Sequence, residues 1–490
     1  MKYVSGILLS LIFLSGCQPA ARMSVREASK HSPSAISISP YHSLKSQIDA
    51  LLPDSLFPPA SVGIKIFSLT KNETLYEVNP SLLFVPASNE KLFTAAATLD
   101  ALGSEYPLTT RLYFDTTSAS KVFVKGFGDP LLSSENLDSI ASELSVVLPS
   151  NRPWTLVGDV SYFDSLYWGS GWMWDDEPDP TAMFITPLSV NSNTISVLVK
   201  PGNGSGDPVI VTTEPVTDFV EIENAGVTTA DSIKERIVVS RRWMERSNTV
   251  TVAGQMRVLD STITRTVSVW KPERYTLTLL SERLRANGLE IGGVELDTVP
   301  LAASEVFVHS HRLDSALAFA LKQSDNLAME NLLKILGAEK RGVPGTAMNG
   351  ISVIKEFLSR EGIDTAKLVL ADGSGVSRYN LTSADIIVQL LQAMYKDPEH
   401  FETFYNSLPN AGVDGSLSNR MKGTSAEGRL HAKTGTLNGV SALSGYVRTA
   451  DGELLAFSMM MQNFPSSAQR YRAVQDNIGK FLSTLKRTDF

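Results

Sequence analysis

The secondary-structure pattern of the sequence changes twice along the chain, and these two changes are the strongest constraint on the fold. Near the start, strand patterns at 61–67 and 74–78 precede a helix pattern at 89–102. From about Tyr106 to Ser304, short runs rich in Val, Ile and Thr alternate with clusters of Gly, Pro and Asp, as in β structure. Three strand patterns and a last helix pattern follow near the end, at 430–436, 442–447, 454–461 and 467–485.

We therefore expect an α+β core in which both ends of the chain contribute strands to one antiparallel sheet. Such a core would consist of residues 46–105 together with 305–490, and residues 106–304 would form inserted β-rich domains. The length of 490 residues agrees with more than one hydrophobic core. Further helix patterns cover 314–322, 327–336, which Gly337 is expected to end, and 350–361.

The N-terminal segment has the pattern of an export signal. Met1-Lys2 is followed by a short apolar run, Val4 to Leu14, and then by Leu14-Ser15-Gly16-Cys17, which resembles a bacterial lipobox. We expect residues 1–17 to be a lipoprotein signal peptide, Cys17 to be lipidated, and residues 18–45 to be a flexible tether. Because Gln18 rather than Asp follows the cysteine, the expected location is the outer membrane, facing the periplasm. The alternative is a plain secretory signal with an incidental cysteine.

Charge and composition exclude several classes of function. The net charge of −8 and the isoelectric point near 5.4 argue against a nucleic-acid partner. Cys17 is the single cysteine, so no intramolecular disulfide is expected. The six histidines show no His-x-x-x-His pair, so neither a metal site nor a cofactor is expected. No later apolar run approaches the 18 residues of a membrane span.

Three short motifs occur in a fixed order, each in the local structure that catalysis would need. They are Ser88-Asn89-Glu90-Lys91, Ser324-Asp325-Asn326 and Lys433-Thr434-Gly435. Singly, each has an ordinary structural explanation: a helix N-cap, a loop between helices, and a strand end before a turn. Ser-x-x-Lys recurs elsewhere in the chain, but only at Ser88 does it follow a proline and open an alanine-rich helix. All three together, in order, are a much less probable coincidence.

The first motif has the geometry of an activated serine. A serine hydroxyl is a poor nucleophile without a base beside it. Residues i and i+3 of a helix share one face, so Lys91 is expected to contact Ser88. Desolvation and the second cation at Lys433 would favour the neutral form of Lys91. Positive potential at the start of the helix would stabilise negative charge that develops on Ser88.

The other two motifs complete an acyl-transfer site. Ser324 is expected to pass a proton to the leaving amine, and Asn326 to orient Lys91 and hold the substrate amide. Lys433 and Thr434 would bind a terminal carboxylate at the end of an exposed strand, along which an extended peptide can pair. The backbone N–H groups of Ser88 and Thr436 are the expected donors to the oxyanion.

These motifs and several longer segments resemble one family, the low-molecular-mass class C penicillin-binding proteins of the D-alanyl-D-alanine carboxypeptidase/endopeptidase type, the S13 peptidases. The resemblance extends from about residue 46 to the end of the chain. Its markers beyond the three motifs are Gly126-Phe127-Gly128-Asp129-Pro130, Gly171-Trp172-Met173-Trp174-Asp175-Asp176, Leu327-Ala328-Met329-Glu330, Asp372-Gly373-Ser374-Gly375-Val376-Ser377-Arg378 and Gly412-Val413-Asp414-Gly415-Ser416-Leu417.

The resemblance implies a fold and an activity. The fold would be a penicillin-binding/serine β-lactamase-like transpeptidase core, an antiparallel sheet flanked by helices. Two nested domains inserted after the nucleophile helix would explain why 236 residues separate Ser88 from Ser324. The activity would be serine-type cleavage of D-alanyl bonds in peptidoglycan stem peptides, as a carboxypeptidase, an endopeptidase or both. Penicillins would inhibit it by forming a slow-clearing acyl-enzyme.

The resemblance also implies further substrate contacts. In related enzymes an acidic residue of the Trp-Asp-Asp segment recognises the free amino end of the diamino acid. Asp175 and Asp176 are both candidates, and a capped turn is an equally good explanation for either. Gly435, Thr436 and Leu437 would line the substrate pocket. Two other features are expected to be non-catalytic: Gly373-Ser374-Gly375 is expected to be a structural turn and His431 a residue of the rim.

Two rival functions remain at this stage. A serine β-lactamase would need fast deacylation, which class A enzymes obtain from a Glu-x-x-Leu-Asn segment, and no such segment follows Asn326. A non-catalytic, cell-wall-binding lipoprotein would have no need of three intact motifs. A persistent penicillin-labelled band separates the peptidase from the lactamase, and release of D-alanine separates it from the binding protein. The oligomeric state is not predicted.

Overall fold

The computed structural model describes residues 42–57, 60–114 and 120–489. The expected signal peptide, Cys17 and all but the last four residues of the expected tether lie outside these ranges. The first described element, α1 (His42–Asp49), begins inside the expected tether. In the described part of the chain, no helix combines the length and apolar character of a membrane span.

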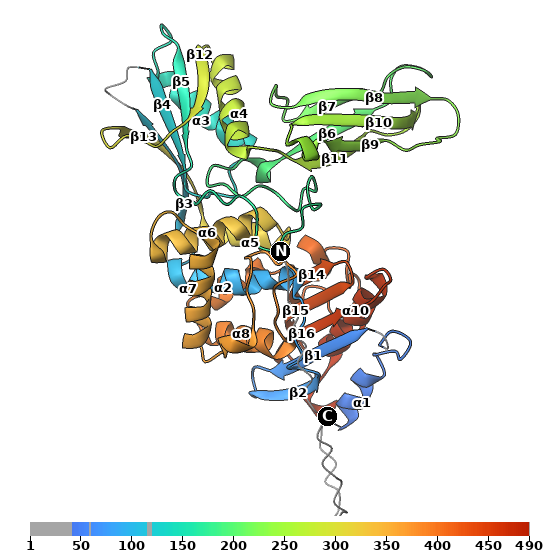
Figure 1. Cartoon of the computed structure of the whole chain (residues 1–490). Coiled ribbons are helices and arrows are strands. Elements are labelled where there is room, and N and C mark those ends of the chain that lie inside the picture. Colours follow the sequence, from blue (N-terminus) through green and yellow to red (C-terminus); the bar gives the residue numbers. More distant parts are fainter. Residues whose placement is uncertain (1–41, 58–59, 115–119, 490) are drawn as a thin grey trace, which may run out of the picture. The chain divides into compact units, whose positions relative to one another are not determined.

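One five-stranded antiparallel sheet joins the two ends of the chain, as the sequence predicts. Its order is β14-β15-β16-β1-β2, so the central strand comes from the C-terminal part and pairs directly with the N-terminal part (Figure 1). The bounds of its strands are β1 (Ser61–Ser68), β2 (Glu73–Val78), β14 (Leu430–Leu437), β15 (Val440–Arg448) and β16 (Leu454–Gln462).

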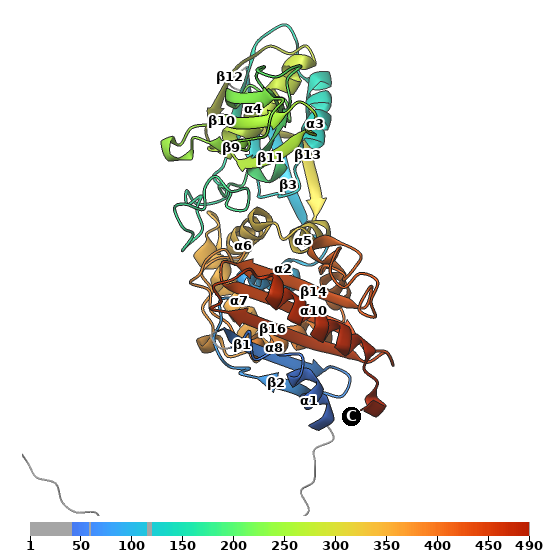
Figure 2. The ribbon, with the colours of Figure 1, turned by 90° about the vertical axis from the view of Figure 1, so that its right-hand side faces the viewer.

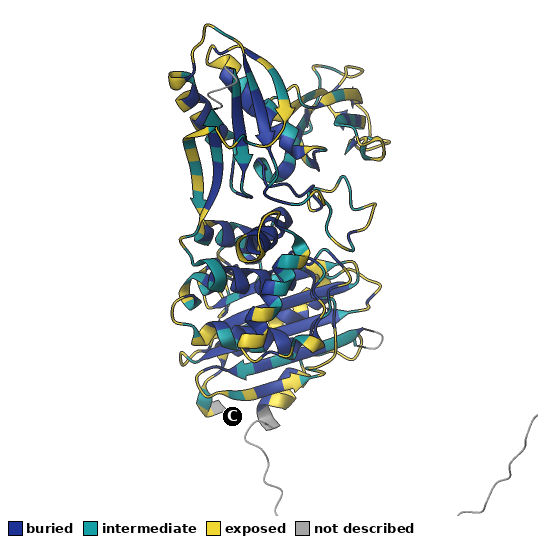
Figure 3. Cartoon of the chain, turned by 60° about the vertical axis from the view of Figure 1, so that its left-hand side comes forward, coloured by how far each residue is buried: buried dark blue, intermediate teal, exposed yellow. Residues whose placement is uncertain are grey.

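The sheet is buried on both faces, which explains the nearly continuous apolar sequence of β16. Alternate residues of β16 enter different cores: Met460 packs with the helices of one face, whereas Met459 and Met461 pack with those of the other. Figure 2 shows α10 (Gln469–Thr484) across one face. The strands of the sheet are mostly buried, and they appear in dark blue in Figure 3. Full burial of each such side chain contributes about 1.5–3 kcal/mol, so sheet and helices stabilise one another.

The other face is covered by helices that carry the catalytic motifs. These are α2 (Lys91–Leu102), α5 (Leu313–Lys322), α6 (Asn326–Arg341), α7 (Ala347–Arg360), α8 (Ala384–Lys396) and α9 (Phe401–Ser407). The expectation that Gly337 ends a helix is wrong, because α6 continues to Arg341. Gly337 serves helix packing instead: a Cβ there would lie 2.6 Å from the carbonyl oxygen of Thr346, just before α7.

The first inserted part is a mixed sheet with two helices. Its strands follow the order β12-β5-β4-β3-β13, and α3 (Ser134–Val147) packs with α4 (Pro272–Ala286) beside it (Figure 1). The prediction of inserted β-rich domains did not identify these two helices. For α3 the missed signal is a capping box between Ser133 and Asn136. The strands are β3 (Pro107–Phe114), β4 (Lys121–Gly126), β5 (Trp154–Asp159), β12 (Ile291–Leu296) and β13 (Ser304–Arg312).

The second inserted part lies between β5 and α4 in the sequence and forms two three-stranded sheets, β11-β6-β7 and β8-β10-β9. The insertion is therefore nested, one domain within another. The strands are β6 (Thr194–Lys200), β7 (Ile210–Glu214), β8 (Glu221–Thr229), β9 (Val238–Arg241), β10 (Thr249–Arg257) and β11 (Ile263–Ser268).

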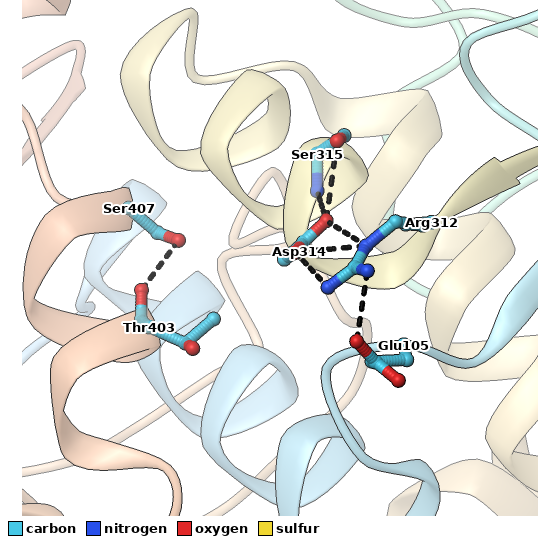
Figure 4. Close-up of polar contacts among 6 residues, drawn as sticks. All are labelled: Glu105, Arg312, Asp314, Ser315, Thr403 and Ser407. Atoms are coloured by element: carbon cyan, nitrogen blue, oxygen red, sulfur yellow. Dashed lines mark hydrogen bonds and ion pairs between the residues drawn. The ribbon is translucent and has the colours of Figure 1, made fainter.

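Polar contacts join the two points where the chain leaves the core and returns to it. Arg312, the last residue of β13, forms ion pairs with Glu105 at 2.9 Å and with Asp314 at 2.8 Å (Figure 4). The backbone N–H of Leu313 donates to the carbonyl of Tyr106 at 3.0 Å. Because these ion pairs are exposed to solvent, they contribute little to stability and serve mainly to align the two crossings.

Candidate active site

Ser88 lies in a tight turn before α2 rather than in the helix itself. The turn is a short 3₁₀ helix, Ala87–Glu90, in which Ser88 is half-buried while Ala87, Asn89 and Glu90 are buried. Ala87 has a positive φ of 48°, an uncommon conformation for a residue with a side chain. A second turn packs against this one at Gly375, whose φ is +84° and whose missing Cβ would lie 1.9 Å from the Ala87 carbonyl oxygen. The Ser88 hydroxyl is thus presented by a rigid, crowded support.

Lys91 contacts Ser88, as the sequence predicts. Its Nζ lies 3.2 Å from the Ser88 Oγ and also donates to the Asn326 Oδ1 at 2.5 Å and to the Ser374 carbonyl oxygen at 2.6 Å. The side chain is completely buried. Burial lowers the pKa of Lys91 to about 8, although Asp372, Asp325, Glu330 and Glu90 oppose the shift. A substantial neutral fraction therefore exists near neutral pH.

Lys433 and Ser324 form a second serine–lysine pair. Lys433 Nζ lies 2.9 Å from Ser324 Oγ and 3.0 Å from the Thr434 carbonyl oxygen. Lys433 is also fully buried, and its pKa falls well below the usual range because of burial and because of the like charge of Lys91. Two buried ammonium groups repel each other, so the site favours at least one neutral amine.

The loop between α5 and α6 presents the Ser-Asp-Asn motif. Ser324 has a φ of +59°, and Asp325 caps α6 by accepting from the backbone N–H of Ala328 at 2.8 Å. Asn326, the first residue of α6, orients Lys91 through its Oδ1 and donates through Nδ2 to the carbonyl oxygen of Thr181 at 2.6 Å. One amide hydrogen of Asn326 stays available for a substrate.

Three buried acids surround Lys91, and sequence reasoning did not assign them. Glu90 is fully buried, and neither of its carboxylate oxygens has a hydrogen-bond partner among the described residues. Burial, aided by Asp372 and Glu330, raises the pKa of Glu90 well above its ordinary value. Burial and Asp372 raise the pKa of Glu330 to about 8. Glu330 is therefore mostly protonated at neutral pH, which limits the negative charge beside Lys91.

Asp372 organises the turn that closes the site from the other side. Its carboxylate accepts from the Trp172 indole at 2.9 Å and from the backbone N–H groups of Gly375 and Ser377 at 2.8 and 2.7 Å. Ser374 is completely buried, and its carbonyl oxygen accepts a hydrogen bond from the Lys91 Nζ. The Gly373-Ser374-Gly375 segment is thus a structural turn, as expected, but one that orients Lys91.

The third motif lies on β14 beside the nucleophile turn. The Asn89 Nδ2 donates to the Lys433 carbonyl oxygen at 3.0 Å, which ties the strand to the turn. Gly435 is buried, whereas the side chains of Thr434 and Thr436 line the same cleft as Ser88. Thr436 Oγ1 accepts from Arg472 of α10 at 3.0 Å. Arg472 places a cation next to the strand, and it was not predicted because it belongs to no motif.

A cleft of about 820 Å³ contains the candidate residues. It is large enough for several residues of an extended peptide. Leu437 lines it, as expected. The two lysines lie buried behind the hydroxyl groups that the cleft exposes. The candidate residues that line the cleft are Ser88, Asp175, Asp176, Ser324, Asn326, Thr434, Thr436 and Leu437.

The two aspartates of the Trp-Asp-Asp segment differ in the hydrogen bonds of their carboxylates. Asp176 Oδ2 accepts from the backbone N–H of Met173 at 2.8 Å, which is a capped turn. Asp175 is exposed in the cleft, and within the part of the chain that the structure describes no hydrogen bond or ion pair holds its carboxylate. Only Asp175 therefore presents an uncommitted negative charge to the cleft.

His431 lies on β14 two residues before Lys433. Its ring stacks on Tyr405 with centroids 4.2 Å apart, and burial lowers its pKa. It does not line the 820 Å³ cleft. These contacts give His431 a packing role behind the strand rather than a place on the rim.

A cluster of two histidines and one aspartate occurs in the inserted part. Asp129, His309 and His311 bring potential metal-ligand atoms within 4.8 Å of one another, and Asp129 Oδ2 lies 2.8 Å from His311 Nδ1. Sequence reasoning missed this cluster because His309 and His311 have the i, i+2 spacing of one face of a strand. Ligands of one zinc ion lie at most about 4.2 Å apart, so the cluster would have to close to bind an ion. No step of the reaction proposed below involves it.

Comparison with known proteins agrees with this site. The family model of the D-Ala-D-Ala carboxypeptidase 3 (S13) family matches residues 44–485. The D-alanyl-D-alanine carboxypeptidase of Actinomadura sp. (strain R39) is 36% identical over 461 residues, covering 90% of this chain and 84% of the relative. The D-alanyl-D-alanine carboxypeptidase DacB of Haemophilus influenzae is 26% identical over 420 residues, covering 83% and 86%.

A solved structure shows the same fold. The crystal structure of penicillin binding protein 4 (dacB) from Haemophilus influenzae has a TM-score of 0.74 and 24% identity, covering 90% of this chain and 99% of the other. The fold is thus that of the penicillin-binding peptidases, with an antiparallel sheet, flanking helices and nested insertions. The chain belongs to the D-Ala-D-Ala carboxypeptidase 3 (S13) family.

Proposed function

We propose that this protein is a serine-type D-Ala-D-Ala carboxypeptidase and D,D-endopeptidase that acts on peptidoglycan stem peptides through an acyl-enzyme on Ser88. The observation that carries the proposal is the contact of Lys91 Nζ with Ser88 Oγ at 3.2 Å, at the edge of a peptide-sized cleft. Family membership supports the same activity, and penicillins are the expected inhibitors.

Acylation begins with neutral Lys91 as the general base. As the Ser88 Oγ attacks the carbonyl carbon of the penultimate D-alanine, its proton passes to the Lys91 Nζ. The backbone N–H groups of Ser88 and Thr436 stabilise the oxyanion of the tetrahedral intermediate. The intermediate collapses as the C–N bond breaks, and the Ser324 hydroxyl protonates the leaving amine. Lys433 returns a proton to Ser324 over their 2.9 Å contact.

Hydrolysis repeats these steps with water in place of the serine. Lys91 first loses to solvent the proton that it took from Ser88, and Lys433 regains one from solvent. Neutral Lys91 then takes a proton from the attacking water and gives it to the Ser88 Oγ as the ester bond breaks. The products are a shortened peptide with a free carboxylate and the regenerated serine. With a terminal D-alanine as leaving group the enzyme is a carboxypeptidase, and with a cross-bridge amine it is an endopeptidase.

The terminal carboxylate of the substrate would bind at β14. Thr434 lines this end of the cleft, Lys433 lies buried behind it with its Nζ 2.9 Å from the Ser324 Oγ, and Arg472 adds a positive charge at Thr436. In the empty site burial holds the pKa of Lys433 low, but an arriving carboxylate favours its charged form. Carboxylate binding is therefore expected to be coupled to proton uptake by Lys433.

Asp175 is our choice for the residue that recognises the amino group of the diamino acid, because Asp176 is committed to a turn. With a substrate that carries a free side-chain amine, Asp175→Asn is expected to raise KM about tenfold or more, whereas Asp176→Asn should act through loop stability. Acetylation of the substrate amine should abolish the difference between wild type and Asp175→Asn. An equal response of both variants would contradict the assignment.

We propose that the protein is exported and anchored through lipidated Cys17 to the outer membrane, on its periplasmic side. The lipobox-like Leu14-Ser15-Gly16-Cys17 supports this location. Cys17→Ala is expected to release the protein into the soluble periplasmic fraction. Unchanged fractionation of that variant would exclude the anchor without affecting the catalytic proposal.

The central experiment combines penicillin labelling with product analysis. After incubation with benzylpenicillin, intact mass spectrometry should show one added drug mass that persists, and peptide mapping should locate it on Ser88. Purified muropeptides should lose terminal D-alanine, and cross-linked muropeptides should yield monomers. Rapid turnover of the drug would point to a β-lactamase, and the absence of both label and products would point to a binding protein.

A further inference from the structure

A second cleft, of about 430 Å³, is lined mainly by aromatic side chains. We call it the aromatic cleft. It gathers four of the six tryptophans of the chain. Such a concentration of large apolar side chains around an open cleft is unusual, because they are normally covered in a soluble protein. Its aromatic residues are Tyr167, Trp168, Trp174, Phe184, Trp243 and Trp270.

The aromatic surface is both exposed and held in place. Trp174 is 72% exposed, and its ring lies 5.3 Å from that of Trp243, at an interplanar angle of 36°. Trp270 packs edge-on against Phe184 at 4.8 Å, and the guanidinium of Arg246 lies 5.1 Å from the Trp270 ring. These contacts fix the ring planes, so a ligand would meet a preformed surface.

The aromatic cleft and the catalytic cleft share one short segment of the chain in their linings. Met173, Asp175 and Asp176 line the catalytic cleft, whereas Trp174, between them, lines the aromatic cleft. Successive Cα atoms are only about 3.8 Å apart, so the two clefts meet at this segment. A substrate that passes Asp175 can therefore extend over Trp174.

The lining matches an uncharged, amphipathic ring. Aromatic faces pack against the C–H faces of a pyranose, while hydroxyl and amide groups of the sugar need a few polar partners at the edge. Glu177 and Arg246 provide such partners at the rim. Glu177 is already neutralised by an ion pair with buried Arg241, and the guanidinium of Arg246 lies over the Trp270 ring, so the lining is dominated by aromatic faces rather than by ion-pairing groups.

We propose that the aromatic cleft binds a pyranose unit of the glycan strand to which the stem peptide is attached. This inference rests on the proposed function, because a peptide held at Ser88 and Asp175 would direct its sugar-bearing end beyond Asp175. Binding energy from such a remote group increases kcat/KM for the natural polymer over that for a free peptide. The enzyme is thus expected to distinguish attached stem peptides from released ones.

The first test compares two substrates that differ only in the sugar. The wild-type enzyme should have a higher kcat/KM for a disaccharide-linked pentapeptide than for the same free pentapeptide. Trp243→Ala should reduce this ratio about three- to tenfold, and Trp243→Phe, which keeps an aromatic face, should largely restore it. Tyr395→Ala is the matched control, since Tyr395 is a partly exposed aromatic residue of α8 outside the cleft. An equal ratio for wild type and Trp243→Ala would overturn the proposal.

The second test does not depend on catalysis. Titration of the full chain with a peptide-free N-acetylated disaccharide should change its tryptophan fluorescence, and Trp243→Ala should weaken that binding. If the wild type binds the disaccharide but cleaves no peptide, the proposed function fails and the aromatic cleft stands. If it cleaves peptides but binds no disaccharide and shows no substrate preference, the cleft proposal fails alone.

Discussion

The site contains two serine–lysine pairs that look alike and differ in their surroundings. Ser88 and Lys91 belong to one turn and the helix that follows it, whereas Ser324 and Lys433 come from a loop and a strand 109 residues apart. Both lysines are fully buried. Lys91, however, has four acidic residues within electrostatic range, while Lys433 has as its charged neighbour another lysine.

This difference gives the two serine–lysine pairs different roles in the reaction. The acids keep the pKa of Lys91 at about 8, where it can both accept and return a proton. Lys433 has no such support, so its charged form depends on an anion that the substrate brings. The first pair is thus suited to nucleophilic attack, and the second to carboxylate binding and proton delivery.

Replacement of each serine should give the largest difference in acylation rate between the two pairs. Ser88→Ala is expected to reduce the acylation rate by roughly 10⁴- to 10⁶-fold and to leave no covalent penicillin adduct, because the attacking atom is gone. Ser324→Ala should still form the adduct, about 10²- to 10⁴-fold more slowly. Stopped-flow acylation and intact mass spectrometry measure both. An adduct on Ser88→Ala would remove the basis of the comparison.

The two lysines should differ in stability more than in activity. Lys91→Met and Lys433→Met should each reduce kcat/KM by about 10²- to 10⁴-fold. Lys91→Met leaves the buried Asn326 Oδ1 and the Ser374 carbonyl oxygen without their donor and should therefore also destabilise the fold, by about 1–3 kcal/mol for each unsatisfied group. Lys433→Met removes a buried amine with a like-charged neighbour and should leave the melting temperature unchanged or higher. Equal melting temperatures for the two variants would contradict the electrostatic contrast.

The pH dependence of the acylation rate should reflect the titration of Lys91. Because a lysine is active as a base in its neutral form, acylation should rise with pH through about 8 and then level off. The rate at pH 7 should be about a tenth of the plateau. In Lys433→Met the midpoint should stay near 8, since burial and the charge of Lys91 both disfavour a charged Lys433 in the empty site. An upward shift of one pH unit would mean that Lys433 carries charge.

A smaller effect should come from the acids around the first pair. Glu330 has a pKa of about 8 in the folded protein against 4.5 as its reference, so its ionisation in the unfolded chain lowers stability progressively from pH 4.5 to 8. Glu330→Gln keeps an acceptor for the Gly373 N–H and removes this dependence. The gain of the variant in free energy of unfolding over the wild type should be near zero at pH 4 and on the order of 1–3 kcal/mol at pH 8, measured by thermal unfolding. A gain that does not vary with pH would refute the assignment.

Much of the fold could be predicted because its signals are local. The strands of the core sheet have short apolar or alternating patterns, and α2 has an unbroken alanine-rich sequence. The errors occurred where the local signal was ambiguous. The Tyr-Thr-Leu-Thr-Leu segment 275–279 of α4 resembles a strand in composition, and Gly337 resembles a helix end although it allows α6 and α7 to pack closely.

The candidate site was predictable only in its motif residues. Ser88, Lys91, Ser324, Asn326 and Lys433 come together as expected. The buried acids, Arg472 and the aromatic cleft were not found, because their significance depends on burial and tertiary neighbours. The choice between Asp175 and Asp176 likewise needed the hydrogen bond that commits one of them to a turn.

The sheet shared by both ends of the chain has a consequence for the timing of activity. Lys433 follows Ser88 by 345 residues, and β1 can acquire its β16 neighbour only when the last strands have been made. At a synthesis rate of 5–20 residues per second, the serine precedes its second amine by roughly 20–70 seconds. Throughout that interval the growing polypeptide holds a nucleophile without the partners that would make it reactive. The hydrolase is thereby inert until translation is almost complete.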